Sequence, residues 1–114
     1  MKTNEVYKNL IYKTNTDNSA RYVLGKYNEN PLVFFGINPS TATISENDNT
    51  ISVIEKIARK FGYDGYIMLN LCPIRATKIS DTFVKTYCEK EMLINLRYVK
   101  NVIKTGQNIV AAWG

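Results

Sequence analysis

Histidine is absent from this chain of 114 residues, which excludes histidine-based catalytic triads, histidine proton shuttles and histidine metal ligands. The two cysteines, Cys72 and Cys88, are not in a C-x-x-C arrangement and follow no secretory signal, so we expect two free thiols. The sequence also lacks the G-x-x-x-x-G-K and G-x-G-x-x-G loops that cradle nucleotide phosphates. The chemistry that remains is that of carboxylates, amides, hydroxyls, tyrosine, lysine, arginine and cysteine.

Long hydrophobic runs are missing as well. No apolar stretch approaches the roughly 20 residues of a membrane-spanning helix, and residues 1–8 lack the apolar centre of a signal peptide. We therefore expect a cytoplasmic protein that does not bind a membrane. The 15 Lys and Arg against 10 Asp and Glu give a net charge of +5, which favours an anionic partner such as DNA or a nucleotide; scattered lysines are equally typical of a solvated surface.

The chain is predicted to have a polar N-terminal arm over residues 1–20 and a single α/β domain over residues 21–114. The arm is interrupted by asparagines and is expected to be loosely ordered or to form a short edge strand. Residues 21–27 are typical of a strand, and the turn signals over residues 28–31 lead into a second strand. We expect these two strands to pair antiparallel.

Three short apolar runs, at residues 32–35, 66–69 and 108–113, predict buried strands of a parallel sheet. The segments between these runs carry apolar residues at helical spacing, so we expect helices that connect the parallel strands by right-handed crossovers. The first helix should begin near Asp48, Asn49 or Thr50 and end at Gly62, with an apolar face made of Ile51, Ile54, Ile57, Ala58 and Phe61. The second should cover residues 80–105, with a break near Tyr87 and Cys88 and an apolar face made of Met92, Leu93, Leu96, Val99 and Ile103.

This order of elements predicts a three-layer α/β/α fold that is incomplete at its C-terminal end. Two helices leave much of a parallel sheet uncovered, so a homo-oligomer that covers the exposed sheet surface is a further expectation.

Polar residues follow the buried strands at the edge where parallel strands end, which is where open α/β sheets bind ligands. The catalytic candidates are Asn38 and Asp48. The candidates for substrate binding are Gly36, Ser40, Thr41, Asn70, Arg75 and Thr77. An asparagine amide offers both a donor and an acceptor, so a pair of asparagines suits the edge of a nucleobase. No metal site or cofactor is predicted.

Each of these candidates also has a purely structural interpretation. Asn38 precedes Pro39 and is suited to shaping a turn, and Asp48 is suited to capping a helix. Arg75 suits either a phosphate or an ion pair at the end of the sheet.

Four segments closely resemble an uncharacterised bacterial family, domain-of-unknown-function family 1643: residues 36–42, 48–51, 70–77 and 112–114. The resemblance extends from about Arg21 to the end of the chain and implies no activity. More distantly, residues 36–39 are similar to the first motif of the mismatch-specific branch of the uracil-DNA glycosylase superfamily. Residues 68–70 and 110–114 resemble two further strand ends of that superfamily, in the same order.

The distant resemblance implies a glycosylase-like fold, in which Asn38 positions the attacking water and Asn70 recognises the base. Because an amide cannot act as a general base, hydrolysis of an N-glycosidic bond would depend on water positioning and on stabilising a cationic sugar. The superfamily's second catalytic motif lies beyond its third core strand, so the resemblance assigns hydrolysis to a longer form. The alternatives left open are a non-enzymatic nucleic-acid or nucleotide binding module and a structural or partner-binding domain.

Overall fold

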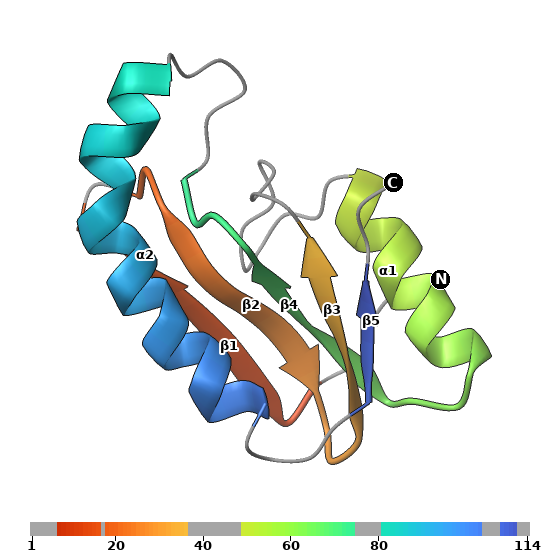
Figure 1. The fold of residues 1–114 in the computed structure, drawn as a ribbon. Coiled ribbons are helices and arrows are strands. Elements are labelled where there is room, and N and C mark those ends of the chain that lie inside the picture. The colour runs from red at the N-terminus through yellow and green to blue at the C-terminus, as the bar shows by residue number, and fades with distance from the viewer. Residues whose placement is uncertain (1–6, 17, 37–48, 75–80, 104–107, 112–114) are drawn as a thin grey trace.

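The computed structural model describes residues 7–16, 18–36, 49–74, 81–103 and 108–111, with side chains in the last helix from residue 89 onward. Over these residues the chain is a mixed α/β fold with one five-stranded sheet and two helices (Figure 1). The strands lie in the order β1-β2-β4-β3-β5. Their bounds are β1 Asn9–Thr14, β2 Arg21–Tyr27, β3 Pro31–Gly36, β4 Gly65–Asn70 and β5 Ile109–Ala111.

The predicted parallel strands are present as β4, β3 and β5, with β3 in the middle of the three and parallel to both neighbours. The sheet as a whole is mixed, because β2 runs antiparallel to β4 and β1 runs antiparallel to β2. The predicted parallel direction is thus confirmed for β3, β4 and β5, and β2 takes the antiparallel direction expected of residues 21–27, although with a different partner. Residues 9–14 take the edge-strand form, which was one of the two forms expected of that segment.

The predicted pairing of β2 with β3 is wrong, because β4 lies between them. All six residues of β4 are buried, so this strand needs a hydrogen-bonded neighbour on each side and cannot lie at an edge. It pairs with β3 along six residues from Pro31–Gly65 to Gly36–Asn70, and with β2 on its other side. The short turn after β2 therefore crosses over β4 and does not form a hairpin.

Helix α1 (Asn49–Lys60) covers one face of the sheet through Ile51, Ile54 and Ala58. These side chains pack with Leu32, Phe34, Tyr66 and Met68 of β3 and β4. Gly62 ends the helix as predicted, with φ +88°. The N–H of Tyr63 donates to the carbonyl of Ala58 and that of Gly62 to the carbonyl of Arg59, which is a Schellman motif. Phe61 lies past the helix and is 67% exposed, so its predicted place in the core is wrong.

Helix α2 (Asp81–Ile103) is continuous, without the predicted break, and packs on the opposite face of the sheet. It lies beside β1 and β2 (Figure 1). From residue 89 onward its buried positions are Glu91, Asn95 and Val99, whereas the predicted apolar face is mostly exposed: Met92, Leu93, Leu96 and Ile103. Two polar contacts explain the difference, because the hydroxyl of Tyr22 donates to Glu91 and the amide of Asn95 donates to the backbone of β4.

The two edges of the sheet differ. At one edge, the hydroxyl of Tyr7, just before β1, donates to Glu55 and accepts a bond from Arg59 on α1. Desolvation, with the bond to Glu55, raises the pKa of Tyr7 to about 12. At the other edge, the three residues of β5 are exposed, so the prediction of a third buried strand is wrong. Neither helix of the described residues is long and apolar enough to cross a membrane.

Candidate functional site

The candidate site lies where the parallel strands β3 and β4 end. Gly36 and Asn70 are the last residues of these strands and face each other in the register. The carbonyl of Gly36 accepts a hydrogen bond from the N–H of Leu71 at 2.9 Å, which continues the ladder one residue past β4. The two strand ends are therefore held together at the edge where the sequence predicts a ligand.

The Asn70 side chain points toward the face covered by α1. Side chains alternate along a strand, and Tyr66 and Met68 of β4 both belong to the cluster packed on α1. A Cβ atom built on Gly36 would lie 2.9 Å from Oδ1 of Asn70 and 2.7 Å from Cε of Met68. A side chain at position 36 would therefore force Met68 or Asn70 to move, so the two strand ends fit together best with glycine there.

Asn70 is 0% exposed, and among the described residues neither Oδ1 nor Nδ2 of its side chain has a hydrogen-bond partner. A buried amide left unpaired costs about 1–3 kcal/mol of stability. Most buried polar groups are paired, so an orphan amide at a strand end is a strong indication of a binding group. Chemically, it offers one acceptor and one donor side by side and no proton-accepting base.

Asn95 is a residue that the sequence interpretation missed. It lies on α2, is 3% exposed, and donates from Nδ2 to the backbone carbonyl of Asn70 at 2.8 Å. This bond connects α2 to the end of β4, directly behind the Asn70 side chain. The sequence signal for it was the spacing of Glu91, Asn95 and Val99, which places three residues on one helical face.

Of the predicted site residues, the structure brings Gly36 and Asn70 together. Asn38, Ser40, Thr41 and Asp48 lie outside the described residues, and so do Arg75 and Thr77. Among the described residues Cys72 forms no disulfide, as predicted, and Cys88 is among the residues whose side chains are not described. Within the described parts of the chain, no three His, Cys, Asp or Glu residues are grouped to hold a metal ion.

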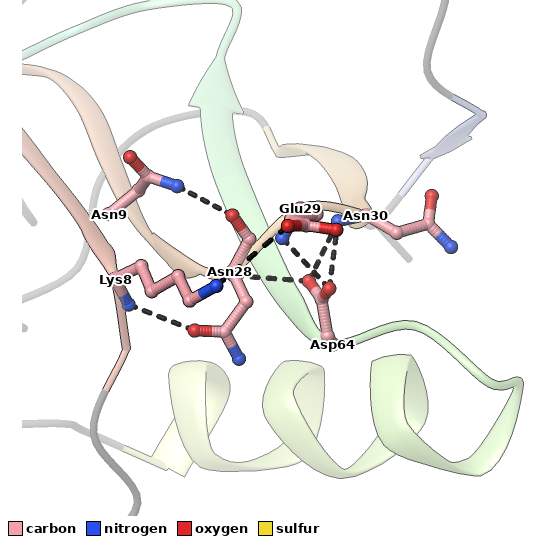
Figure 2. Close-up of polar contacts among 6 residues, drawn as sticks. All are labelled: Lys8, Asn9, Asn28, Glu29, Asn30 and Asp64. Atoms are coloured by element: carbon pink, nitrogen blue, oxygen red, sulfur yellow. Dashed lines mark hydrogen bonds and ion pairs between the residues drawn. The ribbon is translucent and has the colours of Figure 1, made fainter.

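A second polar cluster lies at the opposite end of β4, around Asp64 (Figure 2). Its carboxylate accepts hydrogen bonds from the backbone N–H groups of Asn28, Glu29 and Asn30, at 3.1, 2.8 and 2.9 Å. Desolvation acts to raise the pKa of Asp64, but these hydrogen bonds outweigh it and hold the pKa below its ordinary value of 3.8. Because its oxygens already accept these three N–H groups, Asp64 fixes the turn between β2 and β3, and we assign it no chemistry.

Comparisons with known proteins give one family match and no activity. No curated protein and no solved structure matches the chain. One family model matches residues 21–114, and its description is a protein of unknown function, DUF1643. That match spans β2 to the end of the chain and includes both Gly36 and Asn70. The chain therefore belongs to the DUF1643 family.

Proposed function

We propose that this domain recognises a nucleobase, in DNA or in a nucleotide, through the side chain of Asn70. The observation that carries the proposal is the buried amide, whose oxygen and nitrogen both have no partner among the residues that the structure describes. Its position at the carboxyl ends of β3 and β4 supports it, because ligands of open α/β sheets bind there.

The chemistry of the amide selects the ligand class. The adjacent acceptor and donor of Asn70 match a ring edge that carries a carbonyl beside an N–H, as uracil and thymine do. A carboxylate or phosphate would satisfy only the donor and leave Oδ1 unpaired. The net charge of +5 is consistent with a base carried on a phosphate backbone.

The finer part of the proposal is a relation to the uracil-DNA glycosylases, with hydrolysis of the N-glycosidic bond in a longer form. It is supported by the similarity of residues 36–39 and 68–70 to motifs of that superfamily, in the same order. In this scheme Asn70 recognises the base and Asn38 positions the water. Asn70 has no exposed surface, so the base reaches it only after local opening at the end of β4.

Binding of single-stranded DNA tests the proposal, with one central uracil compared with the same strand carrying cytosine. The assay uses the unmodified chain, Asn70→Leu, which keeps the shape of the side chain but removes both polar atoms, and Asn101→Leu as a matched control. Asn101 is exposed on α2, away from the strand ends. We expect a preference for uracil that Asn70→Leu abolishes and Asn101→Leu retains.

Salt and product analysis separate the remaining outcomes. Binding that falls steeply with salt and ignores uracil would overturn base recognition in favour of a non-specific nucleic-acid module. Uracil-dependent binding without release of free uracil would support a binding module and refute hydrolysis by this chain. Equal loss of binding in both leucine variants would also contradict the role of Asn70.

A further inference from the structure

A pocket of about 770 Å³ lies between α2 and the carboxyl ends of β3 and β4. This volume falls within the range of small-molecule sites. Most of its lining is apolar and comes from Phe35, Leu71, Met92, Leu93, Leu96 and Val99. Asn70 is among its lining residues, but the alternation of side chains along β4 turns the Asn70 amide to the α1 side of the sheet. The pocket lies on the α2 side and is therefore not the site proposed for the base.

The wall of this pocket is the stripe of α2 that the sequence predicts to be core. Met92 is 41% exposed, Leu93 66% and Leu96 48%. These side chains are neighbours at helical spacing, so they form a continuous apolar surface and not scattered exposed residues. Continuous apolar surface of this kind marks a binding site.

One polar group of the pocket has a fixed orientation. Nδ2 of Asn95 donates to the carbonyl of Asn70 at 2.8 Å. A carbonyl can only accept, so the nitrogen of the amide must face it and the oxygen must face away. That oxygen, Oδ1 of Asn95, is buried and has no hydrogen-bond partner in the part of the chain that the structure describes. The pocket therefore contains an acceptor that needs a donor from elsewhere.

We propose that this pocket binds a neutral, mostly apolar small molecule that carries one N–H or O–H donor, which bonds to Oδ1 of Asn95. The apolar lining disfavours a charged ligand, because it would lose its hydration without gaining a partner. Glu89 also lines the pocket, but it is exposed and remains solvated. Oδ1 has almost no solvent contact, so a side chain of the pocket wall has to move aside when the donor binds.

Indole and 1-methylindole form a matched pair of probes, because they share an apolar ring system and differ in the N–H donor. Binding is measured by saturation-transfer NMR with the unmodified chain, Asn95→Leu and Leu96→Trp, and with Asn101→Leu as the control on α2. Leu96→Trp puts a larger side chain into the pocket lining and leaves Asn95 unchanged. Thermal melts of all four proteins show that each is folded.

We expect the unmodified chain to bind indole about fivefold or more tightly than 1-methylindole, since only indole satisfies the buried acceptor. Asn95→Leu should remove this difference, Leu96→Trp should remove both probes, and Asn101→Leu should change neither. Equal binding of the two probes by the unmodified chain would overturn the proposal. The proposal would also be overturned if indole did not bind and light scattering showed a dimer that Leu96→Trp disrupts. In that case a second copy of the chain would cover the pocket.

Discussion

Oδ1 of Asn70 lies 2.9 Å from the place where a Cβ atom of residue 36 would be, so the glycine at the end of β3 and the amide at the end of β4 fit together as a pair. The two residues are partners in the parallel register of β3 and β4. The missing side chain of Gly36 thus gives the Asn70 amide its space. The Asn70 amide is therefore held in place at the carboxyl ends of β3 and β4, the edge at which open α/β sheets bind ligands.

Replacing Gly36 by alanine tests this packing. The new Cβ would lie 2.7 Å from Cε of Met68 and 2.9 Å from Oδ1 of Asn70. The Met68 chain end can shift, but the buried amide has less freedom, so we expect the free energy of unfolding to fall by about 1–3 kcal/mol. Urea denaturation measures it. In the double variant with Asn70→Ala the cost of Gly36→Ala should shrink; strictly additive costs would contradict the pairing.

Asn70→Leu should leave the protein as stable as before or raise the free energy of unfolding by about 1 kcal/mol, because it removes two unpaired polar atoms from a buried site. Asn70→Asp, by contrast, buries a charge without a partner and should destabilise the fold by several kcal/mol. Thermal and urea denaturation compare the two variants. A loss of stability in Asn70→Leu would show that the amide supports the fold and is not reserved for a ligand.

The centre of the sheet was predictable because its signal is local. Residues 32–35 and 66–69 are continuous apolar runs, and such runs are typical of strands buried on both faces. The order of the strands was not predictable in the same way. The turn after β2 has the composition of a hairpin turn, and only the complete burial of β4 shows that it must separate β2 from β3.

The candidate site likewise contains one residue that local sequence identifies and one that it does not. Asn70 was identified from the sequence because it is a polar residue directly after an apolar strand. Asn95 was missed because hydrophobic spacing assigns the buried face of α2 to Met92 and Leu96, and the actual buried face is chosen by hydrogen bonds to other elements. Periodicity cannot report such bonds, since each depends on a partner far away in the chain.

The hydrogen bond between Tyr22 and Glu91 helps to decide which face of α2 is buried, and its contribution can be measured directly. The hydroxyl of Tyr22 donates to the carboxylate of Glu91, which is 8% exposed, and the ring of Tyr22 stacks on Tyr98 at 5.3 Å. Tyr22→Phe keeps the stacking and removes the donor, so we expect a loss of about 1.5–3 kcal/mol in the free energy of unfolding.

Glu91→Leu provides the matching half of a double-mutant cycle. Once the carboxylate is gone, Tyr22→Phe should cost much less, since no buried acceptor is then deprived of its donor. If Tyr22→Phe costs the same in both backgrounds, the position of α2 does not depend on this hydrogen bond.

The hydrogen bonds from backbone N–H groups to the Asp64 carboxylate predict how stability depends on pH. The folded pKa of this carboxyl lies below its ordinary value of 3.8, so its contribution is fully present above that value and is lost as the pH falls through the folded pKa. Asp64→Asn should lower the free energy of unfolding by about 1 kcal/mol near neutral pH, a modest amount because the carboxylate is partly open to water. The difference from the unmodified chain should vanish at pH values below the folded pKa, where Asp64 is itself neutral.

Glu29→Gln is the control: its ion pair with Lys8 spans 3.8 Å between exposed side chains and should contribute almost nothing. A pH-independent difference between the Asp64→Asn variant and the unmodified chain would refute the role of the charge in holding the turn.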